Sequence, residues 1–181
     1  MSNLKVKYLS GFFILISILS FFNIVYSYYF NLYLNLNTYF YTLLVSLLFG
    51  IILYKVKPKS KNSNIFEKIL TILFGYILIP IVLSIPFYFS IYNLSYLNSL
   101  FESVSGFTST GFSVFDNIKH IDQSIIMWRS TIQWIGGLYF LFSIIYLIDI
   151  YDESLKKSLT NFFSFNNSEI LKQITKVFIL Y

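Results

Sequence analysis

The chain has 181 residues and a net charge of +5; charged residues make up 12% of it and hydrophobic residues 56%. Water-soluble domains usually carry about 25% charged residues, so this composition excludes an ordinary soluble domain. It also excludes a disordered chain, which needs low hydrophobicity and high charge. Cysteine is absent and His120 is the single histidine, so we expect no disulfide scaffold, no cysteine-ligated metal site and no histidine-based catalytic triad.

Two membrane-spanning helices are predicted in the first third of the chain. No charged residue lies between Lys7 and Lys55. A spanning helix needs about 20 apolar residues, so we expect two spans, near Tyr8–Phe30 and Thr38–Tyr54. The three asparagines of Asn31–Asn37 favour a turn between them, because their side chains compete for backbone hydrogen bonds. The first apolar stretch exceeds the roughly 7–15 residues of a signal-peptide core, so it is expected to be retained.

Two further spans follow a short basic, polar linker. We expect the third span near Phe66–Phe89, and Pro80 and Pro86 predict a kink or a helix end in its second half. The fourth span is expected near Ile125–Ile148. The residues after it are polar at first and turn apolar again near the end of the sequence, as at the start of another helix.

Positive charge indicates which side of the membrane each segment faces. With the N-terminus in the cytoplasm, all of the 13 basic residues except Lys119 and Arg129 lie on the cytoplasmic side, as the positive-inside rule requires. We therefore expect residues 90–124 to face the exterior. The chain divides into three expected parts: two leading transmembrane helices with a basic cytoplasmic linker (1–64), a span–pore loop–span repeat (65–150), and a cytoplasmic connection that begins a truncated next repeat (151–181).

The segment between the third and fourth spans predicts a loop that enters the membrane and returns. Ser95–Gly106 has apolar residues at helical spacing, Asn93 or Ser95 can cap its start, and Gly106 is a natural stop. A helix of this length extends about 18 Å, which is roughly half of the hydrocarbon thickness. The hydroxyl-rich strip Phe107–Phe112 follows it. Non-helical backbone at that depth must be buried in protein or line a water-filled cavity.

This segment has the chemistry of a cation-selective pore loop. A helix C-terminus at mid-membrane carries partial negative charge, and neighbouring carbonyl oxygens can replace the water around a cation. Gly111 permits backbone angles that let carbonyls point inward. The alternative is an external loop on the protein surface, with solvated Ser and Thr side chains. Asp116, His120 and Asp122 are expected to be ordinary solvated residues, the alternative being an acidic vestibule that attracts cations.

Two motifs resemble a known family. FESVSGFTSTGFSVF (101–115), followed by WRSTIQWIGG (128–137), resembles the first pore repeat of the Trk/Ktr/HKT superfamily of potassium uptake proteins, especially the bacterial Trk transmembrane subunit, and IPFY (85–88) also fits. The resemblance covers nearly the whole chain. It implies an all-α integral membrane protein with two N-terminal transmembrane helices and one helix–pore loop–helix repeat.

The resemblance also implies which residues bind the ion. One quarter of a selectivity filter would be formed by Thr108, Ser109, Thr110, Gly111 and Phe112. Potassium would be bound mainly through the backbone carbonyls of residues 108 to 111. Gly111 would be the filter glycine of potassium-selecting members; in some plant relatives a serine at that position accompanies sodium preference.

Other polar residues and glycines are expected to support the loop. Glu102, inside the pore helix, either raises the local cation concentration or, as we favour, bonds nearby backbone or pairs with Arg129 and so holds the loop. Arg129 itself is expected to be an interfacial anchor at the outer end of the fourth span. Gln133 is expected to be buried and to bond the pore loop or a neighbouring helix. Gly136 and Gly137 are expected to let this span pack closely behind the pore helix.

The resemblance implies potassium uptake across the bacterial cytoplasmic (inner) membrane, with potassium as the transported substrate and no covalently bound cofactor. Because several loops must surround an ion and the sequence has one filter-like segment, we expect a fragment that does not conduct alone. Its expected partners are membrane lipid, the remaining pore repeats or a homodimer partner, and a cytoplasmic nucleotide-binding regulatory subunit; no nucleic acid is expected. The alternative function is a non-conducting membrane scaffold or assembly subunit. An enzyme is not expected, because the chain lacks clustered acidic, His or Cys residues.

Overall fold

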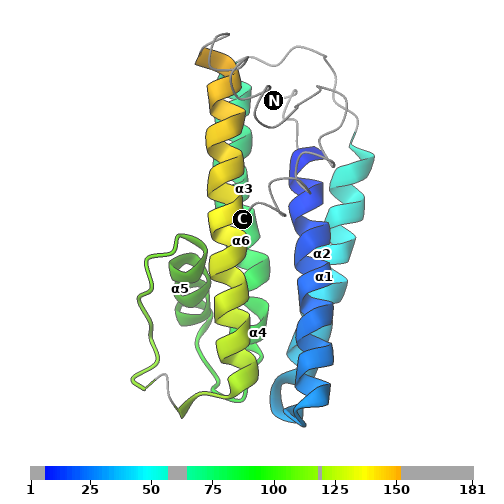
Figure 1. Cartoon of the computed structure of the whole chain (residues 1–181), viewed down its shortest axis with the longest axis vertical. Coiled ribbons are helices and arrows are strands. Elements are labelled where there is room, and N and C mark those ends of the chain that lie inside the picture. Colours follow the sequence, from blue (N-terminus) through cyan, green and yellow to red (C-terminus); the bar gives the residue numbers. More distant parts are fainter. Residues whose placement is uncertain (1–6, 57–64, 118–119, 152–181) are drawn as a thin grey trace.

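A computed structural model describes residues 7–56, 65–117 and 120–151, and these residues form helices joined by loops. The helices are α1 (Lys7–Tyr29), η1, a 3-10 turn (Tyr33–Asn35), α2 (Leu36–Lys55), α3 (Ile65–Leu83), α4 (Ile85–Tyr88), α5 (Tyr96–Phe107) and α6 (Gln123–Tyr151). Figure 1 shows α1 and α2 as an antiparallel hairpin beside α3 and α6, with the short α5 against the other side of α6.

Four stretches are long and apolar enough to cross a membrane: Tyr8–Tyr29, Tyr33–Lys55, Phe66–Tyr88 and Gln123–Leu147. They confirm the expected all-α membrane fold and its four spans. The basic linker and the expected start of a further repeat fall mainly in residues 57–64 and 152–181, which lie outside the described residues.

The second, third and fourth spans differ from the expectation. The fourth, α6, begins two residues before and ends three residues after the expected Ile125–Ile148. The second helix begins at Leu36, earlier than expected, because the 3-10 turn η1 leads directly into it. The third span is divided into α3 and α4 at Ser84, and Pro86 lies in the first turn of α4, where its missing N–H costs nothing. Pro80 lies inside α3, and its carbonyl accepts a hydrogen bond from the Ser84 N–H at 2.9 Å.

Small hydroxyl residues line the contact between α1 and α2. The Thr42 hydroxyl donates to the Thr38 carbonyl at 2.8 Å, so it is satisfied within its own helix. Small side chains allow close approach of helices in lipid, where association cannot rely on the hydrophobic effect. The buried members of this set are Ser10, Ser17, Ser20, Ser27, Thr38, Thr42 and Ser46. The outer faces of both helices carry exposed Phe, Leu and Ile side chains, as expected for a surface in contact with lipid.

The core lies along α6, on which α1, α3 and α5 converge. Tyr139 of α6 is fully buried, its ring packs edge-on against Phe12 of α1, and its hydroxyl donates to the Ile72 carbonyl of α3 at 2.9 Å. Phe107, the last residue of α5, packs against the same ring. Nearer the start of α6, the Trp128 indole N–H donates to the Leu83 carbonyl at 3.1 Å. α6 therefore fixes the position of α5 relative to the spans.

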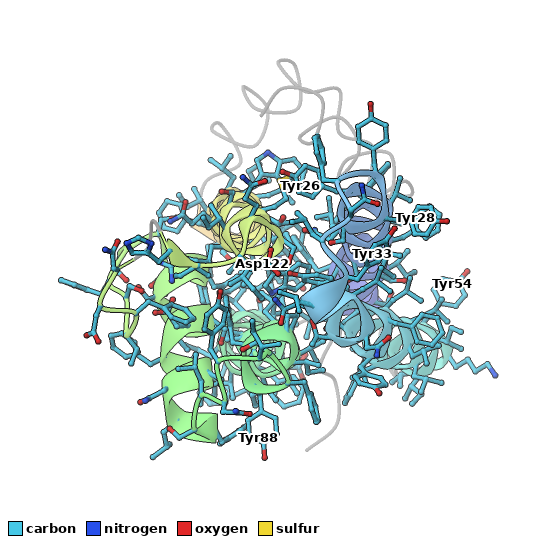
Figure 2. The ribbon with its side chains drawn as sticks, turned by 90° about the horizontal axis from the view of Figure 1, so that it is seen from below. Tyr26, Tyr28, Tyr33, Tyr54, Tyr88 and Asp122 are labelled. Atoms are coloured by element: carbon cyan, nitrogen blue, oxygen red, sulfur yellow. The ribbon has the colours of Figure 1, made fainter. Side chains whose placement is uncertain are left out.

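Asn35 connects the α1–α2 hairpin to the rest of the chain at the end where α6 begins. It is fully buried; its amide N–H donates to Asp122 Oδ2 at 2.6 Å and its Oδ1 accepts from the Ile91 N–H at 3.1 Å. The other carboxylate oxygen, Asp122 Oδ1, accepts from the Ser124 N–H at 3.1 Å, which caps the start of α6. In Figure 2, which looks at this end, Asp122 lies near the centre of the molecule whereas Tyr88 points outward. Asp122 is therefore a structural residue, not the solvated loop residue that we expected.

Candidate functional site: a pore loop

The pore helix α5 enters beside α6 and ends about halfway along it. Its N-cap is Ser95, one of the two residues that we expected could cap it. The Ser95 hydroxyl accepts from the Asn98 N–H at 3.3 Å. Figure 1 shows the chain leaving α5 near the middle of α6 and returning to the end where α6 begins. The helix is displaced by one residue from the expected Ser95–Gly106 and runs from Tyr96 to Phe107.

The end of α5 is set by Ser109, which adopts the left-handed region with φ 56°. The Ser109 N–H donates to the Gly106 carbonyl and the Thr110 N–H to the Ser105 carbonyl, both at 3.0 Å. This pair of bonds is the Schellman arrangement, which satisfies the last carbonyls of a helix. Gly106 is therefore not the stop that we expected. It lies inside α5, where an added Cβ would be 2.9 Å from Ile132 Cγ2 of α6.

The residues after α5 present free carbonyl groups. Within the described ranges, the carbonyl oxygens of Thr108, Ser109, Thr110 and Gly111 accept no hydrogen bond. Gly111 has φ 79°, which favours glycine, and no atom lies within 4 Å of where its Cβ would be. Phe112 differs from these four residues, because its carbonyl accepts from the Ser105 hydroxyl at 2.6 Å.

The threonine hydroxyls of this segment bond back to α5. Thr108 Oγ1 donates to the Val104 carbonyl at 2.8 Å, and Thr110 Oγ1 donates to the Ser105 carbonyl at 3.1 Å. The two threonine side chains thus hold the segment against the end of α5. The backbone carbonyls of residues 108 to 111 accept no hydrogen bond from the described residues. In selectivity filters, backbone carbonyls replace the hydration shell of a cation and coordinate the ion directly.

Glu102 forms the polar centre behind this segment. It is 2% exposed, and its Oε1 accepts from the Ser113 hydroxyl at 2.6 Å and from the Val114 N–H at 2.5 Å. Its Oε2 accepts from Arg129 Nη1 of α6, which also donates to Ser113 Oγ at 3.1 Å. Glu102 therefore connects α5, on which it lies, to α6 and to the loop residues Ser113 and Val114. These are contacts of the kind that we favoured for it, with nearby backbone and with Arg129. Arg129 is an internal ion-pair partner, not only an anchor at the membrane interface.

α6 supplies the surface behind the end of α5. A Cβ built on Gly136 would lie 1.9 Å from the Phe107 carbonyl oxygen, so only glycine permits this approach of the two backbones. Gly137, beside it, is half-buried. Gln133 is exposed on α6, so our expectation that it is buried was wrong.

Two residues that form hydrogen bonds within the site were missed by the sequence analysis, one at the end of α5 and one in the loop. Ser105 bonds the backbone of Phe112, and Ser113 links Glu102 to Arg129. A serine in the last turn of a helix that precedes a hydroxyl-rich strip is a weak signal for such a contact, because Ser and Thr side chains often bond local backbone. Nothing in the sequence indicates which backbone atom is the partner.

Comparisons with known proteins show which family the chain resembles in sequence. A family model described as TrkH, cation transport protein, matches residues 44–181. An uncharacterized cation transporter of Methanocaldococcus jannaschii is 33% identical over 110 residues, which are 60% of this chain and 23% of that protein. The Trk system potassium uptake protein TrkG of Escherichia coli is 30% identical over 86 residues, 47% of this chain and 18% of TrkG.

A third relative, the Trk system potassium uptake protein TrkI of Halomonas elongata, is 37% identical over 60 residues, 33% of this chain and 11% of TrkI. The chain thus spans less than a quarter of the length of these curated relatives. No solved structure matches it significantly. Together with the four apolar helices, the matches identify a multi-pass membrane protein.

Proposed function

Because the chain belongs to the TrkH family of cation transport proteins, we propose that it contributes one quarter of a potassium selectivity filter. The ion is coordinated by the backbone carbonyls of residues 108 to 111. The complete protein takes up potassium across the bacterial cytoplasmic membrane, and the N-terminus of this chain faces the cytoplasm.

The free carbonyls of residues 108 to 111 carry this proposal. Unpaired carbonyls are costly in a membrane unless water or an ion satisfies them. α5 directs its C-terminal end, with its partial negative charge, toward the same segment. The positive φ angles of Ser109 and Gly111 interrupt the alternation of carbonyl directions that an extended strand would have. A strip of carbonyls facing one axis is the arrangement that replaces the hydration shell of potassium.

A single loop cannot surround an ion, so the filter requires three more loops of this kind. They come from the remaining pore repeats, in the same polypeptide or in associated chains, and this segment alone does not conduct. Glu102, Arg129, Gly106, Gly136 and Gly137 hold the loop against α6. A cytoplasmic nucleotide-binding regulatory subunit is the partner that we propose for the cytoplasmic side.

Replacing Gly111 by Ser is expected to lower the preference for potassium over sodium by about tenfold. A side chain at φ 79° strains the backbone by about 1–3 kcal/mol, and each 1.4 kcal/mol corresponds to about a tenfold change in an equilibrium. The open space around Gly111 lets the backbone relax, so the carbonyls turn and the protein still folds. The measurement is the ratio of potassium to sodium uptake by the complete transporter in cells that lack other potassium uptake systems.

Asn98→Ser, an exposed change on α5, is the matched control and should leave the ratio unchanged. A Gly111→Ser protein that reaches the membrane in normal amount and keeps the original ion preference would contradict the filter assignment. That result would instead indicate that the loop has a packing role in the transporter.

A further inference from the structure

Ser105 forms hydrogen bonds with three residues of the loop that follows α5: Thr110, Gly111 and Phe112. It is 4% exposed in the last turn of α5, and its hydroxyl donates to the Phe112 carbonyl at 2.6 Å. Its own carbonyl accepts from the Thr110 N–H at 3.0 Å and from the Gly111 N–H at 3.5 Å. The Thr110 hydroxyl lies 3.1 Å from both oxygens of Ser105 and can donate its proton to either. One buried residue thus bonds three consecutive residues of the loop.

These bonds divide the backbone of the loop into two parts. The carbonyls of residues 108 to 111 accept no hydrogen bond from any described residue, and the next one, on Phe112, accepts from the Ser105 hydroxyl. We propose that Ser105 is a positioning residue that fixes the outer limit of the ion-coordinating backbone, between Gly111 and Phe112. The inference rests on the proposed function. It removes the Phe112 carbonyl from the set of expected potassium ligands.

Among the described residues, packing contributes little to holding this part of the loop, so we assign that role to the hydrogen bonds of Ser105. Apart from Gly111 and its two chain neighbours, no described residue has an atom within 4 Å of a Cβ built on Gly111, and the Phe112 side chain is 70% exposed. Without the Ser105 hydroxyl, the Phe112 carbonyl is unpaired and free to rotate. An additional carbonyl facing the ion path would change the number of ligands, on which the choice between potassium and sodium depends.

The other buried serines of α5 do not reach the loop. The Ser99 hydroxyl donates to the Ser95 carbonyl at 3.0 Å, within its own helix segment. The Ser103 hydroxyl donates to the Pro80 and Leu100 carbonyls, at 2.9 and 2.8 Å. Ser99 is therefore a matched control, because it has the same side chain, helix and burial but no contact with residues 108 to 112.

The test is Ser105→Ala in the complete transporter, compared with Ser99→Ala, Ser105→Thr and Gly111→Ser. The readouts are the potassium-to-sodium uptake ratio and the amount of protein in the membrane. A hydrogen bond contributes about 0.5–1.5 kcal/mol net, so Ser105→Ala is expected to lower the ratio about twofold to tenfold. Ser105→Thr, which keeps a hydroxyl, should retain most of the ratio, and Ser99→Ala should keep all of it. A loss of stability alone would lower the amount of protein but would not change the ratio.

If Ser105→Ala is poorly expressed, Ser105→Cys is the second variant, because a thiol is nearly the same size and a weak donor. It should give a reduced ratio as well. An unchanged ratio in Ser105→Ala or Ser105→Cys, with Gly111→Ser altered, would overturn the role of Ser105 and leave the proposed function intact. An unchanged ratio in both Ser105→Ala and Gly111→Ser would overturn the proposed function itself.

Discussion

Replacing Glu102 by Gln is expected to lower the free energy of unfolding by about 3–5 kcal/mol, because it leaves a mostly buried Arg129 without its counter-charge. The side chain of Arg129 is 14% exposed and that of Glu102 is 0% exposed, so water cannot replace the lost partner. Gln keeps one oxygen that can accept from Ser113 and Val114. Its amide N–H group then faces the N–H group of Arg129, and neither can accept a hydrogen bond from the other. The variant thus removes the charge and the acceptor that faces Arg129, while keeping the acceptor that faces Ser113 and Val114.

The measurement for Glu102→Gln is the thermal unfolding midpoint of the purified complete transporter, together with its potassium uptake. Asp116→Asn removes the same charge from an exposed position and is the control, with no expected shift. Adding Arg129→Met to Glu102→Gln should restore much of the midpoint, because no unpaired charge is then buried. A midpoint of Glu102→Gln equal to that of Asp116→Asn would contradict the structural role of the ion pair.

Replacing Gly136 by Ala is expected to abolish most of the uptake by displacing the end of α5. An added methyl group would lie 1.9 Å from the Phe107 carbonyl oxygen and 2.6 Å from its carbonyl carbon. Both atoms belong to backbone, so the helices must separate. Overpacking of this kind typically costs about 1–3 kcal/mol. Alanine gains about 1 kcal/mol in helix propensity, which is too little to offset the upper part of that range.

Gly50→Ala is the matched control for Gly136→Ala. Its new methyl group would lie 3.0 Å from Ile14 Cγ1, a side-chain atom that can shift. We expect Gly50→Ala to keep normal uptake and Gly136→Ala to lower both the unfolding midpoint and the uptake. Normal uptake in Gly136→Ala would show that the position of α5 against α6 does not determine the filter.

The four spans were predictable because length and apolar composition determine whether a helix can cross a membrane. The pore helix was predictable to within one residue, from its spacing of apolar residues and the cap at Ser95. The residue that ends the helix was predicted wrongly, because Ser109 adopts a left-handed angle that glycine usually provides, while Gly106 serves for contact with α6. Local propensity cannot distinguish a glycine that ends a helix from one that packs inside it.

Some of the polar contacts could also be predicted from the sequence, and others could not. The pairing of Glu102 with Arg129 was one of the expected alternatives, since an acid inside a membrane needs a partner, but Arg129 was expected to be an interfacial anchor. The bond between Asn35 and Asp122 was not, because these residues lie 87 positions apart and only the packed hairpin brings them together. Gln133 was placed wrongly because its polarity does not reveal which face of α6 is covered.

The central claim is that four backbone carbonyls of this loop coordinate the transported ion. Thallium(I) resembles potassium in charge and size and scatters X-rays anomalously, so crystals of the complete transporter grown with thallium test the claim directly. We predict anomalous density within coordinating distance of the carbonyl oxygens of residues 108 to 111, and none bound to the carbonyl of Phe112. Density elsewhere in the protein, with these four oxygens bonded to protein donors, would contradict the account.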